Sequence, residues 1–74
     1  MKIEEGIVKE VYLTDNSNEI GFKVQTSKEL LNIIEYQNID NSNIYKNDKV
    51  KVITDKINNK EVKYLSSLKE NINV

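Results

Sequence analysis

Lysines alternate with apolar residues in the segment 49–66, and this pattern is the clearest binding chemistry in the sequence. A period of two places the lysines on one face of a β-strand and the apolar residues on the other. A row of cations on a sheet face can follow the backbone of a single-stranded nucleic acid. The residues of this candidate surface are Lys49, Lys51, Lys63, Lys46 and Tyr45.

Other features weaken the nucleic-acid interpretation. The chain contains no Arg, so bidentate contacts to phosphate or guanine are excluded. The net charge is −1, and acidic residues at 48, 55 and 61 interrupt the lysines. The alternation also assigns Phe22 and Tyr64 to the core, which removes two stacking groups. Outward lysines on a hairpin commonly form a solvated face that resists aggregation, so we keep nucleic-acid binding as the alternative function.

An exposed apolar surface is the competing hypothesis. Val8 and Tyr12 share the second face of the first expected strand, and Leu30 and Ile34 belong to the one expected helix. If incompletely covered, these residues form a contact patch. A chain of 74 residues has a small core, and without Cys or His it has no disulfide or Cys/His zinc site to reinforce it. We therefore expect a protein-interaction or self-association module with an unknown protein, or a second copy, as partner.

Catalysis is not expected from this composition. The absence of Cys and His excludes a thiol nucleophile and an imidazole base. Neither the adjacent acids Glu4 and Glu5 nor the acids around the turn 15–19 show the spacing of a general acid/base pair or an EF-hand. Both glycines are isolated, so no phosphate-binding loop is present. We expect no enzyme activity, no cofactor and no metal.

Location is predicted from what the sequence does not contain. No apolar run approaches the ~18 residues of a membrane span, and residues 1–10 are too charged for the apolar part of a signal peptide. These observations predict a cytoplasmic protein with no membrane partner. Lys without Arg, together with abundant Asn and Ile, is typical of AT-rich coding sequence. It suggests a low-GC bacterium, or one of its mobile elements, as the source.

Two β-hairpins must position these surfaces. The first joins strands over residues 6–14 and 19–25 through a cluster of turn formers at 15–18. Its first strand is apolar on both faces, which fits a long curled strand, a bulge near Lys9 and Glu10, a bend at Gly6, or a plain edge strand. The second strand has Ile20, Phe22 and Val24 pointing inward. The second hairpin joins residues 49–54 and 60–66 through a turn at Asn58 and Asn59, with Val62 and Tyr64 inward.

A short helix is predicted between the hairpins, near residues 27–36. Thr26 and Glu29 match a helix capping box, and the following leucines and isoleucines form a broad apolar face. The segment 30–36 also fits a strand, and the capping pattern favours the helix. The predicted fold is mainly β (α+β): a small antiparallel β-barrel of order β-β-α-β-β. Residues 1–68 form one domain, and residues 69–74 form a frayed C-terminal tail.

Two short motifs resemble small β-barrel modules of the OB and SH3-like groups. Residues 6–11, GIVKEV, resemble their G-x-V-x-x-V opening strand. Residues 47–52, NDKVKV, resemble their Gly-Asp-x-Val-x-Val turn and strand, with Asn in place of the usual Gly. The resemblance covers about a dozen residues. It implies a barrel, and implies no particular partner.

Overall fold

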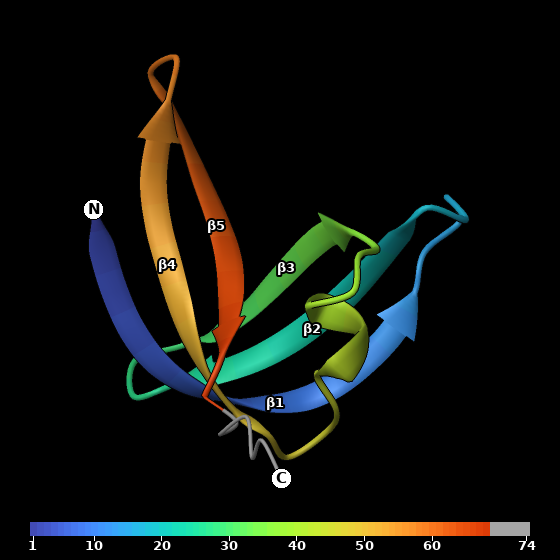
Figure 1. Cartoon of the computed structure of the whole chain (residues 1–74). Helices are drawn as coiled ribbons and strands as arrows, with labels where there is room; N and C mark the ends of the chain where they lie inside the picture. Colours follow the sequence, from blue (N-terminus) through green and yellow to red (C-terminus); the bar gives the residue numbers. More distant parts are fainter. Residues whose placement is uncertain (69–74) are drawn as a thin grey trace, which may run out of the picture.

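The computed structural model describes residues 1–68, which form a sheet of five antiparallel strands (Figure 1). The predicted frayed tail, 69–74, lies outside the described residues. No helix in residues 1–68 has the length and apolar character needed to cross a bilayer. The strands are β1 (Lys2–Leu13), β2 (Glu19–Thr26), β3 (Leu30–Tyr36), β4 (Lys49–Ile57) and β5 (Lys60–Ser67).

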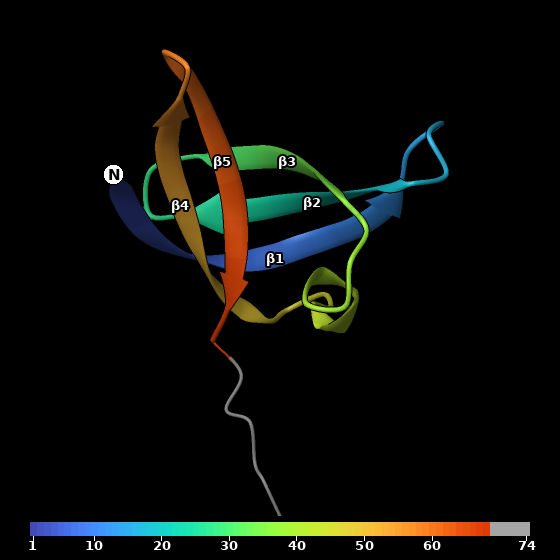
Figure 2. The ribbon, with the colours of Figure 1, turned by 45° about the horizontal axis from the view of Figure 1, so that its top comes forward.

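The strands lie in the order β3-β2-β1-β4-β5, so the last hairpin is placed beside β1 rather than beside β3. The sheet curls into a half-barrel, and the β4–β5 hairpin stands across β1, β2 and β3 (Figures 1 and 2). All four pairings are antiparallel, so the two edge strands β3 and β5 run in the same direction. No described strand pairing joins these edges. The predicted small β-structure is confirmed in this coarser form, as an open half-barrel.

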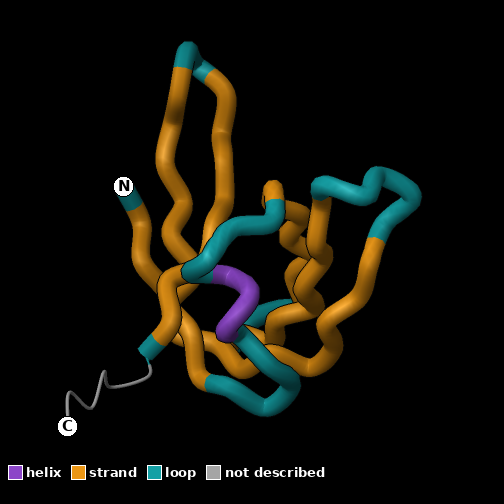
Figure 3. Tube along the Cα trace, turned by 45° about the vertical axis from the view of Figure 1, so that its right-hand side comes forward, coloured by secondary structure: helices purple, strands orange, loops and turns teal. Residues whose placement is uncertain are grey.

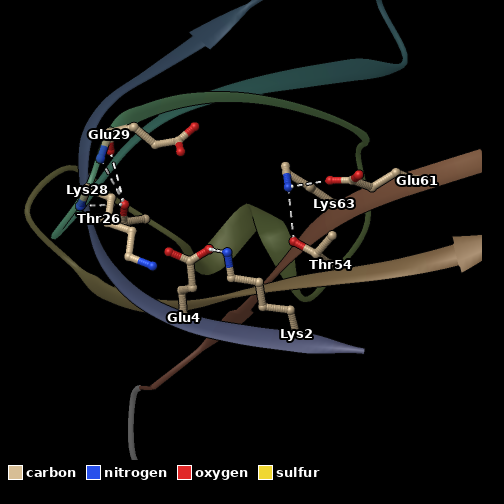
Figure 4. A network of polar contacts seen from close by, with 8 residues as sticks. All are labelled: Lys2, Glu4, Thr26, Lys28, Glu29, Thr54, Glu61 and Lys63. Atoms are coloured by element: carbon tan, nitrogen blue, oxygen red, sulfur yellow. Dashed lines mark hydrogen bonds and ion pairs between the residues drawn. The ribbon is translucent and has the colours of Figure 1, made fainter.

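The predicted helix near 27–36 is wrong, because residues 30–36 form β3 and pair with β2 along their whole length. The only helical segment in the described residues is the 3-10 turn η1 (Asn41–Asn43), drawn in purple in Figure 3. Thr26 does accept hydrogen bonds from the backbone N–H groups of Lys28 and Glu29, both at 3.2 Å (Figure 4). These bonds form a tight turn between two strands, since the Thr26 N–H also donates to the Glu29 carbonyl at 2.9 Å.

The core lies on the concave face of the sheet. Phe22 and Val24 are fully buried, which confirms the predicted inward face of β2, and Val50 and Val52 meet them from β4. Ile44, from the loop that follows η1, is only 3% exposed and covers the core from outside the sheet. Within residues 1–68, the buried apolar residues are Val8, Phe22, Val24, Ile33, Ile44, Val50 and Val52.

Strand β1 belongs to both halves of the sheet. It pairs with β4 through its first half and with β2 through its second half, and the register shifts between Val8 and Glu10. This shift is the bulge near Lys9 and Glu10, one of the alternatives that the sequence left open for this strand. Gly6 lies against β2 with no room for a side chain: a Cβ there would lie 2.6 Å from Val24 Cγ1. The curl of the sheet therefore depends on a missing side chain as well as on the bulge.

Candidate functional site

The predicted lysine surface is divided between two faces of the sheet. Lys49 and Lys51 share the outer, convex face of β4, because Val50 and Val52 occupy the inner face. Lys63 does not join them. Figure 4 shows its ammonium group on the concave side, where it donates to Thr54 Oγ1 at 3.0 Å and to Glu61 Oε1 at 2.9 Å. The prediction that these three lysines share one face is therefore wrong.

The length of the β4–β5 turn explains the error. Asn58 and Asn59 form a two-residue turn in which both have positive φ, 52° and 64°. The turn pairs Ile57 with Lys60, and paired residues share a face. With the even-numbered valines of β4 inside, the odd-numbered residues of β5 are inside too. Glu61, Lys63 and Leu65 consequently face the concave side, while Val62 and Tyr64, predicted to be core, lie on the outer face.

The Glu61–Lys63 pair is the place where the described residues show shifted ionisation. The hydrogen bond from Lys63, followed by its charge, lowers the pKa of Glu61. The same hydrogen bond raises the pKa of Lys63 against a smaller opposing effect of desolvation. Both directions stabilise the charged forms, so this is a surface ion pair and not a group adjusted for proton transfer.

The remaining residues of the predicted lysine surface lie in the loop before β4. Tyr45 is 59% exposed, and its backbone N–H donates to Asp48 Oδ2 at 2.8 Å. Lys46 is exposed beside it. The structure thus places two lysines on the outer face of β4 and one lysine in the adjoining loop.

A second surface lies on the outer face of β1, β2 and β3, and it is built around Tyr12. The register places Tyr12 opposite Gly21, and the ring covers this glycine: a Cβ on Gly21 would lie 2.7 Å from Tyr12 Cε1. The Tyr12 hydroxyl then donates to Asn32 Oδ1 on β3. The tyrosine therefore crosses all three strands and is fixed at both ends of its side chain.

Apolar side chains surround this tyrosine on the same face. Ile34 lies opposite Gly21 and is 49% exposed, and Leu30 and Tyr36 are 56% and 73% exposed. Strand alternation puts all three outside, because Leu31, Ile33 and Glu35 point inward. We call this surface the tyrosine face, and its residues are Tyr12, Lys23, Leu30, Asn32, Ile34 and Tyr36.

The tyrosine face is close to electrically neutral. Its cation, Lys23, forms an ion pair with Glu10 at 3.1 Å. The Lys23 ammonium also lies 6.0 Å from the centroid of the Tyr12 ring, at the limit of a cation–π contact. One neutralised lysine beside three exposed apolar or aromatic side chains and the half-buried Tyr12 gives a surface with weak attraction for polyanions.

Of the four residues predicted for a protein interface, the structure brings three together. Tyr12, Leu30 and Ile34 share the tyrosine face, whereas Val8 has no exposed surface and belongs to the core. Sequence reasoning missed Asn32, Tyr36 and the part played by Gly21. The signal was the alternation in residues 30–36, where every second residue from Leu30 onward faces outward once the segment is taken as a strand.

A pocket of about 340 Å³ adjoins the tyrosine face near Gly6. The outer residues Ile7, Gln25 and Lys49 line it, and the register aligns the same three with Leu30 across four strands. Its remaining lining residues are Glu5, Gly6, Thr26 and Ser27. The pocket combines the apolar side chain of Ile7 with polar side chains such as Gln25 and Lys49, which suits a side chain of a partner.

No cluster of three acidic residues in the described part of the chain is close enough to hold a metal ion. Comparison with known protein families, with curated proteins and with solved structures finds no match for this chain.

Proposed function

We propose that this protein is a non-enzymatic protein-interaction module whose contact surface is the tyrosine face. The observation that carries the proposal is three exposed apolar or aromatic side chains, Leu30, Ile34 and Tyr36, gathered around the half-buried Tyr12 on one neutral sheet face. Protein interfaces are enriched in aromatic residues and depleted of charge at their centre. Tyr12 is already fixed by Gly21 and Asn32, so binding orders little that is not ordered in the free protein.

The strand order supports the choice of this face. We propose that the half-barrel is of OB type, because it is a five-stranded, partly open barrel in which β3 and β5 flank the opening. Proteins of that type bind their ligands on the face of the second and third strands. In this chain that face carries most of the tyrosine face. The same analogy makes single-stranded nucleic acid the second candidate, since Tyr12 and Tyr36 could stack bases there.

Charge favours the protein partner over nucleic acid. A nucleic-acid surface needs cations to neutralise phosphates, and the cation of the tyrosine face is bound to Glu10. Lys49 and Lys51, on the outer face of β4, lie beyond Ile7 and Glu5 of β1. Their surroundings include Glu5, which the register places opposite Lys51.

Site-specific photo-crosslinking in cells of the source organism tests the proposal. A photoreactive phenylalanine replaces Tyr36 on the tyrosine face or, as control, Ile39, which is 82% exposed in the following loop. We expect a protein adduct from position 36 that position 39 does not give and that Ile34→Asp abolishes. An adduct with nucleic acid, or equal adducts from both positions, would overturn the proposal. A salt titration with single-stranded DNA measures the second candidate directly.

A further inference from the structure

A second exposed apolar surface lies on the opposite half of the sheet, on the outer face of β1, β4 and β5. The two registers align Ile3, Ile53 and Tyr64 in one row across the three strands. Ile3 is 53% exposed, Tyr64 is 39% exposed, and Ile53 between them is partly buried. We call these three residues the isoleucine row. It is separate from the tyrosine face and does not depend on the function proposed for that face.

Along β4, charges of opposite sign lie on either side of this row, and Glu5 of β1 lies opposite the positive one. Along the outer face of β4, Lys51 precedes Ile53 by two residues and Asp55 follows it by two. At about 3.3 Å per residue, each charge lies about 7 Å from the row. No ion pair within residues 1–68 uses Lys51 or Asp55. Asp55 Oδ1 accepts only the N–H of the next residue, Lys56, at 2.9 Å.

This pattern is complementary to itself when the strand is reversed. We propose that the outer face of β1, β4 and β5 binds a second copy of the chain, with a two-fold axis running along the isoleucine row. Each residue of the row then faces its counterpart, and Lys51 of each copy faces Asp55 of the other. Packing with the strands parallel would place Lys51 against Lys51, so charge selects the antiparallel, isologous arrangement.

The size of the patch sets the strength of the dimer. Stable complexes bury roughly 800 Å² on each partner, and a patch centred on three side chains is smaller. We therefore expect a weak dimer, with a dissociation constant between roughly tens of micromolar and about one millimolar. The tyrosine face has no equivalent self-complementarity, because Lys23 is paired with Glu10 of its own chain. It stays available to another partner in the dimer.

A charge-swap experiment tests this arrangement by sedimentation equilibrium between about 10 µM and 1 mM. The single variants Lys51→Asp and Asp55→Lys each create two like-charge contacts, so dimerisation should weaken at least tenfold. The double variant Lys51→Asp/Asp55→Lys restores opposite charges and should recover wild-type affinity within about threefold. Lys28→Asp, a charge reversal on the β2–β3 turn, is the matched control and should have no effect. Circular dichroism confirms that each variant is folded.

Three outcomes would overturn the proposal: a wild-type monomer at 1 mM, single variants that dimerise normally, or a double variant that does not recover. Ile34→Asp separates this surface from the tyrosine face, since it should leave the dimer unchanged. Binding of single-stranded DNA by the same variants distinguishes a dimer contact of Lys51 from a nucleic-acid contact. If Lys51 bound nucleic acid instead, Lys51→Asp would lose DNA binding and the double variant would not regain it.

Discussion

The contact between Tyr12 and Gly21 shows how one missing side chain shapes a surface. A tyrosine ring laid across a neighbouring strand needs a position without a Cβ beneath it, and Gly21 provides that position. Neither of the two glycines has positive φ, so Gly21 is needed here for space and not for an unusual backbone. The hydroxyl bond to Asn32 then fixes the far end of the ring.

Replacing Gly21 by Ala should displace the Tyr12 ring from the sheet. The added Cβ would lie 2.7 Å from Tyr12 Cε1, which forces the side chain to a new position and costs roughly 1–3 kcal/mol. Urea unfolding measures the loss of stability, and the chemical shifts of Asn32 report the broken hydrogen bond. In a Tyr12→Ala background the same substitution should be nearly neutral, because the clash is gone. An equal cost in both backgrounds would show that Tyr12 is not the cause.

At the scale of the elements, the β4–β5 hairpin holds the ion pair between Glu61 and Lys63. Lys63 lowers the pKa of Glu61, so this carboxylate contributes stability above its unfolded-state pKa and loses it as the pH falls through the folded-state value. Glu61 raises the pKa of Lys63, so that contribution is present below the unfolded-state pKa of Lys63 and is lost as the pH rises through its folded-state value. Both side chains are therefore charged, and the ion pair contributes to stability, at pH values between the folded-state pKa of Glu61 and that of Lys63.

Lys63→Met should return the pKa of Glu61 toward that of an ordinary glutamate, because it removes both the hydrogen bond and the nearest charge. An NMR titration of the Glu61 carboxyl group follows this directly. Lys60→Met removes a charge from the same strand without touching the pair, and should leave the Glu61 pKa nearly unchanged. Equal upward shifts in both variants would mean that general charge, and not the Lys63 hydrogen bond, lowers the pKa of Glu61.

Much of the element order could be predicted, because alternation and turn residues are local. The strands at 19–25, 49–54 and 60–66 all lie within observed strands. The prediction of a helix was wrong because the Thr26 hydroxyl accepts the N–H of Glu29 in this strand-to-strand turn, just as it would at the start of a helix. Residues 30–36 therefore had to be judged by their pairing with β2, which the capping pattern does not test.

The candidate surfaces were less predictable, because a face depends on register. The turn at Asn58 and Asn59 was recognisable from sequence, and its two-residue length already determines that Lys63 points inward. By contrast, Val8 and Tyr12 lie on opposite faces because β1 changes register at Lys9, between them. A bulge inverts every later side chain of its strand, and its position is not determined by β1 alone. Tyr12 reaches the outer face only as a result of this shift.

At the scale of the whole molecule, the open seam between β3 and β5 is the weakest boundary of the half-barrel. One described hydrogen bond spans it: the Leu65 N–H of β5 donates to Glu35 Oε2 of β3 at 3.0 Å. This side-chain bond lies where backbone hydrogen bonds between β3 and β5 would close a full barrel. Leu65 also packs against the core, so the seam lies close to the buried residues that hold the molecule together.

Glu35→Ala should open this seam, because the Leu65 N–H would lose its acceptor while its side chain still packs against the core. We expect a loss of about 1 kcal/mol in unfolding free energy, and hydrogen exchange at the Leu65 amide should accelerate more than at amides paired within β1–β2. Glu35→Gln keeps an acceptor oxygen in place and should retain most of that protection. If both variants protected the Leu65 amide equally, packing alone would hold β5 against β3. Selective loss in Glu35→Ala would show instead that one carboxylate restrains the free end of a sheet whose ladder is incomplete.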